Sequence, residues 1–400
     1  MSVPDLSATN GDVYVAGVLA ATLERTGDGV RFAYLPEYVE DDGAPVATTL
    51  PVTADALLTP SGALPPFFTG LLPEGRRLSG LRRAVKTSLD DELSLLLAVG
   101  ADPVGNVQIV PAGTAPNRTD ALVQVESSWT EVVFSELMDA AEVVDPVALP
   151  GVQDKASARM ISVPVARAGL RYILKVSPSE FPLVIENEAY FIALARQAGL
   201  ATVRAEIVHD AAGRSGLLVE RFDRVPIDGD TVCLAAEDAA QVLGIYPADK
   251  YAVTTERVCT ALADRCSARP VALRDLVRQV CFAWFTGNGD LHAKNLSILS
   301  TPAGEWRVSP AYDLPSTVPY GDRTMALSIG GSKTGLSRRA LLAFAGDLGL
   351  PARAAERVLD QALTATARTP DDIARGAIPL DRNALRAWTK ELRHRRRLAE

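Results

Sequence analysis

Alternating apolar and polar positions run through the first part of this 400-residue chain. Such alternation is typical of strands that bury one face. We predict strands over residues 13–20, 30–35 and 47–52, with a Gly-Asp-Gly turn at 27–29 joining the first two. The aromatic segment 65–75 is interrupted by prolines, which favours a tight turn or a short helix packed in the core.

A helix closes this N-terminal unit. Ser88 and Asp91 have the spacing of a capping box, so we expect a helix that begins at Ser88, runs through 93–99 and ends at Gly100. The unit ends near Pro111, and a polar stretch rich in Gly, Pro and Thr then predicts a linker. The chain thus divides into an N-terminal unit, a linker, a strand-rich lobe and a helical lobe, at residues 1–111, 112–127, 128–225 and 226–400.

The pattern of apolar residues in the strand-rich lobe has the spacing of strands in some segments and of helices in others. A second capping box, Ser128 with Glu131, predicts a helix to about Glu142. Helical spacing of apolar residues over 186–199 predicts an amphipathic helix that ends at Gly199. We predict four further strands, at residues 158–163, 171–176, 205–209 and 215–220.

The C-terminal lobe reads as mostly helical. We predict helices at residues 237–243, 255–267, 273–285, 338–346, 352–366 and 382–398, and short strands at 296–299 and 306–308. The segment between Asp313 and Ser337 is rich in Gly, Ser and Pro, which predicts a mobile loop of the activation type.

Composition narrows the class of protein. A hydrophobic fraction of 48% is enough for a sizeable core, but no stretch approaches the roughly 20 apolar residues of a membrane span. The first residues lack the basic and apolar regions of a secretory signal, so we expect a soluble cytoplasmic protein without a membrane partner. The cysteines, at positions 233, 259, 266 and 281, have no metal-ligand spacing and fit reduced, buried thiols.

Charge argues against a broad nucleic-acid surface. The formal net charge is −8, whereas proteins that bind nucleic acid over a large face are usually basic. One basic cluster lies near the C-terminus, at Arg393, Arg395, Arg396 and Arg397. We expect it to be the solvated last turn of a helix.

The polar loop at residues 286–298 carries the main candidate chemistry. An apolar run leads into it and predicts a buried helix stopped by Gly287 and Gly289. Asp290 and Asn295 then place a carboxylate and a carboxamide five residues apart. In protein kinases such an Asp accepts the proton of the substrate hydroxyl, and the Asn holds magnesium. The same residues are also ordinary turn formers, so a purely structural loop remains an alternative.

Three further segments fit phosphoryl transfer. Asp313 follows a predicted strand, where a kinase keeps its second metal ligand, although a capping carboxylate is the alternative. Lys175 lies on an apolar strand, and Glu188 at the start of the next helix can pair with it, unless Lys175 faces solvent from an edge strand. The Gly and Lys of the segment 148–157 could present backbone N–H groups to phosphate, or form an ordinary turn.

Taken in order, these motifs resemble the HipA-type serine/threonine kinases, the toxin half of bacterial toxin–antitoxin pairs. Phe67-Phe-Thr-Gly-Leu-Leu-Pro-Glu-Gly75 resembles the N-terminal signature of that family, and Leu149-Pro-Gly-Val-Gln-Asp-Lys155 resembles its phosphate loop. Gly289-Asp-Leu-His-Ala-Lys-Asn295 and Pro310-Ala-Tyr-Asp-Leu314 resemble its catalytic loop and metal motif. The resemblance covers nearly the whole chain. It implies an α+β fold: a two-lobed, protein-kinase-like molecule with an extra N-terminal α+β subdomain and a mostly helical C-terminal lobe.

The resemblance also implies roles for individual residues. Asp290 would be the general base, and Asn295 and Asp313 would bind Mg²⁺. ATP would be held by Lys175 with its partner Glu188, and by a phosphate loop of Pro150, Gly151, Val152, Gln153, Asp154 and Lys155. The hinge against the adenine ring would be Glu220, Arg221 and Phe222, and His292, Lys294 and Tyr312 would lie beside the nucleotide or the metal. Without the resemblance, His292 would be expected only to brace its loop.

One position departs from the family. Its members can carry a serine three residues before the glycine of the phosphate loop, and phosphorylation of that serine in cis shuts the kinase off. Ala148 stands at that place here. We therefore expect this form of self-inactivation to be missing, or to use Ser157 or a residue of the 316–324 segment.

The family resemblance further implies partners and leaves alternatives. A small helix-turn-helix antitoxin would bind the protein, and operator DNA would be reached mainly through that antitoxin. The protein substrate suggested by the family is an aminoacyl-tRNA synthetase or another translation factor. The alternatives are a small-molecule kinase of the aminoglycoside or choline type and a non-catalytic, nucleotide-binding co-repressor.

Overall fold

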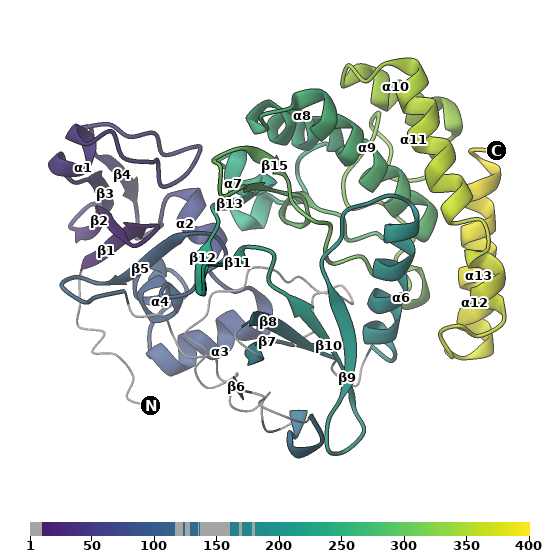
Figure 1. The fold of residues 1–400 in the computed structure, drawn as a ribbon, viewed down its shortest axis with the longest axis horizontal. Coiled ribbons are helices and arrows are strands. Elements are labelled where there is room, and N and C mark those ends of the chain that lie inside the picture. The colour runs from purple at the N-terminus through teal and green to yellow at the C-terminus, as the bar shows by residue number, and fades with distance from the viewer. Residues whose placement is uncertain are drawn as a thin grey trace.

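The structure is a computed structural model that describes residues 10–116, 123–124, 129–134, 136, 161–167, 170–177 and 181–400. The predicted phosphate loop and Ala148 lie outside the described residues, as do Ser157 and most of the predicted helix at 128–142. Figure 1 shows the N-terminal unit on the left, a second sheet below the centre and the helical lobe on the right.

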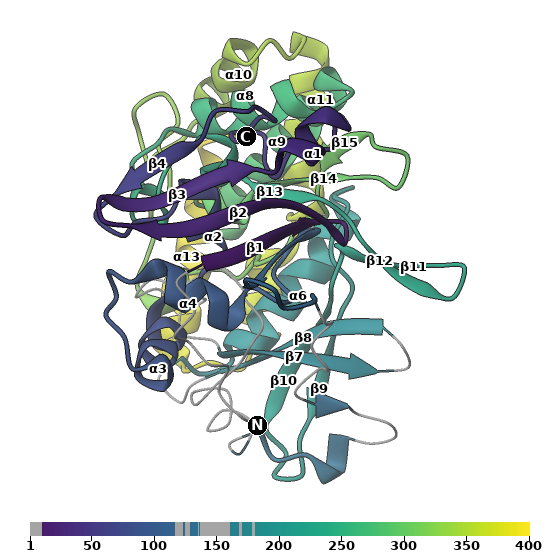
Figure 2. The same cartoon turned by 90° about the vertical axis from the view of Figure 1, so that its left-hand side faces the viewer.

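The N-terminal unit is built on a five-stranded antiparallel sheet with the strand order β4-β3-β2-β1-β5. Figure 2 looks towards this sheet. The helices contribute to one apolar core with the sheet, in which Phe32 of β3 contacts Phe68 of α2 with ring centroids 5.5 Å apart. The elements are β1 (Asn10–Val15), β2 (Val18–Thr26), β3 (Gly29–Tyr34), α1 (Pro36–Glu40), β4 (Leu57–Pro60), α2 (Pro66–Leu71), α3 (Gly75–Val85), α4 (Glu92–Val99) and β5 (Val107–Pro111).

Two boundaries in this unit differ from the prediction. Residues 13–20 are not one strand, because Ala16 and Gly17 have φ values of 49° and 83° and reverse the chain between β1 and β2. The N-cap of α4 is Asp91 and not Ser88, since it is the Asp91 side chain that accepts from a backbone N–H of the first turn. The helical segment predicted as an alternative within 65–75 is confirmed as α2.

The predicted strand at 47–52 is wrong. The hydroxyl of Tyr34 accepts from the backbone N–H of Val46 at 2.8 Å and donates to the carbonyl of Leu50 at 2.5 Å. A buried side chain therefore bonds this stretch of backbone, and the edge position of the sheet is taken by β4.

The strand-rich lobe is a second five-stranded sheet with the order β6-β7-β8-β10-β9. Leu217 and Val219 on one face of β10 pack with α6, and Leu218 packs with Leu174 in a separate cluster. The predicted strands at 205–209 and 215–220 are confirmed. The elements are β6 (Val123–Gln124), the 3-10 helix η1 (Trp129–Glu131), β7 (Ile161–Arg167), β8 (Leu170–Val176), α6 (Val184–Gln197), β9 (Ala205–His209) and β10 (Ser215–Glu220).

The C-terminal lobe surrounds α9, in which every residue from Gln279 to Thr286 is buried. Two small sheets, β11-β12 and β13-β14-β15, lie beside the helices. The short helix α12 and the β11-β12 hairpin were not predicted. The elements are β11 (Arg224–Ile227), β12 (Asp230–Cys233), β13 (Ala236–Asp238), α7 (Ala239–Val242), η3 (Pro247–Asp249), α8 (Thr255–Arg265), α9 (Arg269–Thr286), η4 (Ala293–Asn295), β14 (Ser297–Ser300), β15 (Trp306–Val308), η5 (Val318–Tyr320), α10 (Arg338–Asp347), α11 (Ala352–Ala365), α12 (Thr369–Ala374) and α13 (Arg382–Arg397). The predicted α+β class is confirmed.

Two predictions about the surface of this lobe are wrong. The segment after Asp313 is packed, since Met325, Leu327 and Ile329 are buried in the core of the lobe. The C-terminal basic cluster is not wholly solvated, because the Arg395 side chain is fully buried and donates to the backbone carbonyls of Trp284 and Arg323.

Three of the four cysteines are buried as predicted, whereas Cys233 is partly exposed. All four cysteines are free, and burial raises the pKa of the Cys266 thiol to about 11 and that of Cys281 to about 12. In the part of the chain that the structure describes, no helix has both the length and the apolar character needed to span a membrane.

Candidate active site

Two glycines shape the loop that carries Asp290. Gly287 ends α9 with a left-handed φ of 72°, which confirms the predicted stop, and a Cβ there would lie 2.5 Å from Cγ2 of Val318. A Cβ on Gly289 would lie 2.5 Å from Oγ1 of Thr317. Only glycine lets the two segments lie this close together.

Asp290 is buried and its position is fixed by its neighbours. The Tyr251 hydroxyl donates to Oδ1 of Asp290 at 3.2 Å. The backbone N–H of Asp290 donates to Oδ1 of Asn288 at 2.8 Å, and Nδ2 of Asn295 donates to the Asp290 carbonyl at 2.8 Å. Burial and the Asp290 charge raise the pKa of Tyr251, so the tyrosine stays protonated as a donor. The carboxylate is therefore oriented by the protein before any substrate binds.

Lys175 lies between two carboxylates. Its Nζ is 2.7 Å from Oε1 of Glu188 and 3.1 Å from Oδ1 of Asp313, so the predicted contact between strand lysine and helix glutamate is confirmed. Burial alone would lower the pKa of Lys175, but Asp313 and Glu188 raise it by more, so the net pKa lies above the usual value. Burial raises the pKa of Glu188 to about 7, with Asp313 adding to the rise and Lys175 opposing it. The two shifts differ in their main cause: the neighbouring carboxylates raise the pKa of Lys175, whereas burial itself raises that of Glu188.

Asp313 and Asn295 face each other and fit a magnesium ion. Nδ2 of Asn295 donates to Oδ2 of Asp313 at 2.9 Å, in addition to its bond with the Asp290 carbonyl. With that nitrogen engaged, the amide oxygen of Asn295 and the carboxylate of Asp313 are neighbouring oxygen ligands, the type that Mg²⁺ prefers. Among the described residues no group of three or more His, Cys, Asp and Glu could hold a metal.

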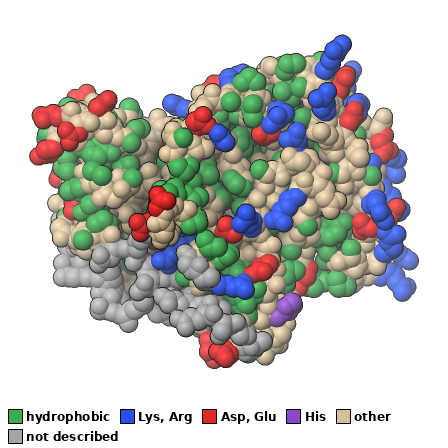
Figure 3. All heavy atoms as spheres, in the orientation of Figure 1, with side chains coloured by type: hydrophobic (Ala, Val, Ile, Leu, Met, Phe, Trp, Pro, Cys, Tyr) green, Lys and Arg blue, Asp and Glu red, His purple; other side chains and the backbone are tan. Residues whose placement is uncertain are grey.

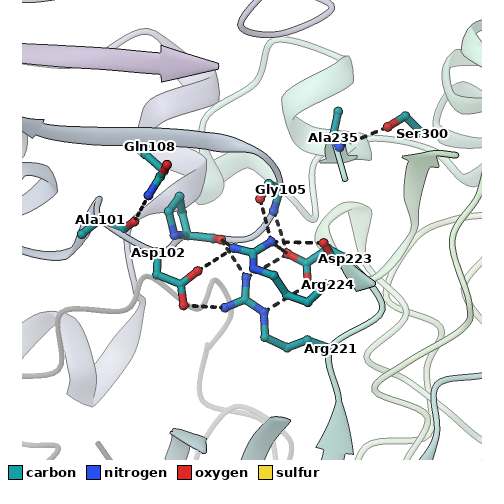
Figure 4. Close-up of polar contacts among 10 residues, drawn as sticks. Ala101, Asp102, Gly105, Gln108, Arg221, Asp223, Arg224, Ala235 and Ser300 are labelled. Atoms are coloured by element: carbon teal, nitrogen blue, oxygen red, sulfur yellow. Dashed lines mark hydrogen bonds and ion pairs between the residues drawn. The ribbon is translucent and has the colours of Figure 1, made fainter. Parts of the chain in front are cut away.

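The predicted hinge residue Arg221 directs its side chain away from this cluster. Figure 4 shows the guanidinium groups of Arg221 and Arg224 gathered around Asp102 and Asp223. Nη2 of Arg221 is 2.8 Å from Oδ2 of Asp223, and Nη2 of Arg224 is 2.6 Å from Oδ1 of Asp102. Burial raises the pKa of Asp223, but Arg221 and Arg224 hold it well below its usual range. Because Asp102 belongs to the N-terminal unit, this network joins that unit to the segment that follows β10.

Of the other two predicted hinge residues, Phe222 contacts Tyr312. Glu220 ends β10, and Phe222 stacks on the Tyr312 ring with centroids 5.6 Å apart and planes 23° apart. The Tyr312 hydroxyl donates to the carbonyl of Lys294 at 2.8 Å and lies 2.5 Å from Oγ of Ser297. Tyr312 thus connects Phe222 to the loop that carries Lys294, one residue before Asp313.

His292 and Lys294 are buried on the far side of the same loop. The His292 ring lies edge-on to Tyr251, with centroids 5.0 Å apart, and burial together with the charge of Lys250 lowers its pKa well below the usual value. A neutral ring packed in this way fits the bracing alternative. The Lys294 ammonium donates to the Gly70 carbonyl at 3.1 Å and lies 2.7 Å from Oε1 of Glu74.

Sequence reasoning missed several residues around the site. Tyr251 contacts Asp290 from 39 positions away, and Glu74 contacts Lys294 from 220 positions away. Asn187 is also missed: its side chain donates to the Ser316 carbonyl and accepts from the Ser316 N–H, each at 2.9 Å. No local pattern marks such contacts, although Glu74 lies inside the Phe67–Gly75 signature and could have been singled out there.

The structure brings together the side chains of Lys175, Glu188, Asn295 and Asp313, and Asn295 links them to Asp290. One ammonium, three carboxylates and one amide from four separate segments can bind phosphate, coordinate a divalent cation and accept a proton. The phosphate-loop residues 150–155 lie outside the described residues.

Family models match two parts of this chain. The HipA N-terminal domain matches residues 11–110, and the HipA-like C-terminal domain matches residues 147–369. A Sinorhizobium fredii protein named "Putative kinase Y4mE" is 33% identical over 330 residues, which cover 77% of each chain. The serine/threonine-protein kinase toxin HipA of Shewanella oneidensis is 27% identical over 362 residues, covering 82% of this chain and 81% of the toxin.

The fold agrees with these matches. A solved Shewanella oneidensis structure, of the toxin–antitoxin proteins HipA and HipB with their operator DNA, superimposes with a TM-score of 0.74. The match covers 96% of each chain at 24% sequence identity, so it bears on the fold. The family models and the relatives together show that this chain belongs to the HipA family.

Proposed function

We propose that this protein is a serine/threonine protein kinase that transfers the γ-phosphate of ATP to a hydroxyl group of another protein. The observation that carries the proposal is the convergence of Lys175, Glu188, Asn295 and Asp313 beside Asp290. Each of these side chains has the type and the order along the chain that phosphoryl transfer by a kinase requires.

In this proposal Asp290 accepts the proton of the substrate hydroxyl. The hydroxyl oxygen bonds to the γ-phosphorus as the bond from that phosphorus to the β–γ bridging oxygen breaks, and ADP leaves. Lys175 neutralises phosphate oxygens while Glu188 keeps its ammonium in place. Mg²⁺, held by Asn295 and Asp313, would supply further neutralisation of phosphate charge. Residues 150–155 and 220–222, with His292, Lys294 and Tyr312, complete the proposed surroundings of the nucleotide.

We further propose that the kinase is the toxin of a HipBA-like module. Its neutralising partner would be a helix-turn-helix antitoxin, and its substrate a protein of the translation machinery such as an aminoacyl-tRNA synthetase. Membership of the family and the fold shared with a HipA solved beside HipB and operator DNA support this reading. The net charge of −8 suits a protein that reaches DNA mainly through its partner.

Phosphate transfer in a cell lysate tests the proposal. Purified wild-type protein, Asp290→Asn and Asp313→Asn would each be incubated with lysate, radiolabelled ATP and Mg²⁺. We expect label in a discrete protein band with wild type and at least a 100-fold loss, on the order expected for catalytic groups, in both variants. Asn keeps the size of each side chain and the backbone tolerance needed at position 313, so both variants should remain folded, although an asparagine at position 313 can accept only one of the two hydrogen bonds that Asp313 accepts.

The other outcomes separate the alternatives. Label confined to small molecules would contradict the proposal in favour of a small-molecule kinase. Tight, Mg²⁺-dependent ATP binding without any transfer would favour a non-catalytic co-repressor. Transfer that persists in Asp290→Asn would remove Asp290 from the role of general base.

A further inference from the structure

One carboxylate of the N-terminal unit reaches into the candidate catalytic loop. Glu74, the residue before α3, places Oε1 2.7 Å from Nζ of Lys294 and Oε2 2.5 Å from Nζ of Lys250. The two lysines come from different parts of the C-terminal lobe. A single side chain therefore ties the N-terminal unit to that lobe at two points.

Each lysine is next in sequence to a residue of the proposed active site or to one that bonds to it. Lys294 precedes Asn295, and its backbone carbonyl accepts from Tyr312, the residue before Asp313. Lys250 precedes Tyr251, which donates to the carboxylate of Asp290. Lys250 also accepts a backbone hydrogen bond from Ala293 at 3.3 Å, so its main chain lies against the catalytic loop.

Burial makes the two lysines dependent on a carboxylate. The Lys250 side chain is fully buried and that of Lys294 is 2% exposed, whereas Glu74 is 13% exposed. Although burial alone would raise it, Lys294 and Lys250 lower the pKa of Glu74 to about 2, so the carboxylate is charged at neutral pH. An unpaired ammonium in such a place is strongly unfavourable, and the local backbone would move to hydrate it.

The segment that carries Glu74 is hydrogen-bonded to the C-terminal lobe. Nε2 of Gln241 in α7 donates to the Phe67 carbonyl at 3.1 Å, and the Tyr246 hydroxyl donates to the Leu64 carbonyl at 3.2 Å. At Gly70 of α2 a Cβ would lie 2.9 Å from the Gln241 side chain, so helix and side chain are already in close contact. In Figure 1, α2 lies between the N-terminal sheet and α7.

We propose that Glu74 is a positioning residue for phosphoryl transfer. By holding Lys250 and Lys294, it fixes the positions of Asp290 and Asn295. The N-terminal unit is then a part of the active site that the same chain supplies. The inference rests on the proposed kinase function. Glu74 itself touches neither substrate nor nucleotide in this proposal, and its effect passes through the loop that it anchors.

The test compares Glu74→Gln with the matched control Glu237→Gln. Glu237 is also a buried carboxylate at the junction with the N-terminal unit, where its side chain accepts from the Thr48 N–H and hydroxyl at 2.9 Å each. Its backbone pairs with Ile298, beyond Asn295, and this pairing does not depend on the side chain. We expect Glu74→Gln to lower kcat by roughly 10- to 100-fold, the usual loss when the partner of an active-site group is removed. We expect ATP affinity to fall by less than kcat does, because Lys175 and Glu188 bind each other from other segments of the chain. Glu237→Gln should leave both values unchanged.

A second readout does not need kinase activity. Hydrogen–deuterium exchange should quicken in residues 288–296 of Glu74→Gln and stay at the wild-type rate in Glu237→Gln. Wild-type kcat with unchanged exchange in Glu74→Gln would overturn the inference. So would equal effects of the two variants, because they would indicate general weakening of the junction.

Two provisions keep the result interpretable. If Glu74→Gln does not fold, the charge-balanced double variant Glu74→Gln/Lys250→Met replaces it, and it should still lower kcat because Lys294 has lost its carboxylate. If wild-type protein transfers no phosphate, the proposed function fails, and the exchange experiment alone then decides whether Glu74 orders the loop.

Discussion

Asp313 shows how much of the site depends on a single residue. Its φ of 55° is left-handed, which costs most residues about 1–2 kcal/mol, while Asp and Asn tolerate it better. Its carboxylate also lies against Lys175 and Asn295. The position requires backbone tolerance for folding and a negative charge for the proposed chemistry, and aspartate supplies both.

These two requirements can be separated by mutation. We expect Asp313→Ala to be less stable than Asp313→Asn by about 1 kcal/mol or more, since alanine lacks both the tolerance and the hydrogen bonds. Both variants should lose phosphate transfer. Urea unfolding measures the difference, and equal free energies of unfolding would show that the left-handed backbone is not strained at this position.

Basic residues on the two faces of helix α13 have different roles. Arg395 is fully buried, with its guanidinium carbon 4.3 Å from the centre of the Trp284 ring and its Nε 2.8 Å from Glu391. The other face of α13 carries cations that line a groove of about 500 Å³: Arg382, Arg386, Lys390, Arg393 and Arg397. Figure 3 shows Lys and Arg side chains along the edge of the molecule where α12 and α13 lie.

The buried arginine is expected to support the fold. Arg395→Met would leave the carbonyls of Trp284 and Arg323 without this donor, so we expect a loss of about 3 kcal/mol in the free energy of unfolding. The control is Arg393→Met on the same helix, where the solvent-exposed pair with Asp371 should contribute little to stability. Equal losses in chemical denaturation would contradict this assignment of roles.

At the scale of the whole molecule, charged side chains of the described residues join the N-terminal unit to the rest of the chain at several places. Among them are the contacts of Glu74 with Lys294, of Asp102 with Arg221, and of Glu237 with Thr48. The last of these is unusual because the carboxylate bonds only to neutral donors among its recorded contacts. Burial raises the pKa of Glu237 to about 7, although the bonds from Thr48 oppose the rise.

This raised pKa predicts a pH dependence of stability. Between about pH 4.5 and 7 the folded protein binds the Glu237 proton more tightly than the unfolded chain, so this residue makes the free energy of unfolding fall as pH rises. Glu237→Gln removes that contribution. The stability of the variant minus that of wild type should therefore be larger at pH 8 than at pH 5. Thermal unfolding of both proteins at both pH values measures this difference. A difference that is the same at both pH values would contradict the assignment.

Local sequence patterns predicted much of this molecule where the interactions are local. The strands at 205–209 and 215–220, the helix end at Gly287 and the order Lys175, Glu188, Asp290, Asn295, Asp313 all follow from periodicity, turn residues and short motifs. The same reasoning failed where a non-local partner decides the outcome. The Tyr34 hydroxyl bonds with the backbone of Val46 and Leu50 where a strand was predicted at residues 47–52, and apolar packing holds part of the segment after Asp313.

The sequence by itself determined the α+β class, the family and the identity of the side chains that would handle phosphate. Only the tertiary structure decided that Arg395 is buried, that Tyr251 orients Asp290, and that Glu74 holds Lys250 and Lys294. The physical reason is that the local sequence around a charged residue does not show which residue it will pair with. Whether it faces water or an opposite charge depends on which distant segments fold against it, and burial then sets the strength of the interaction.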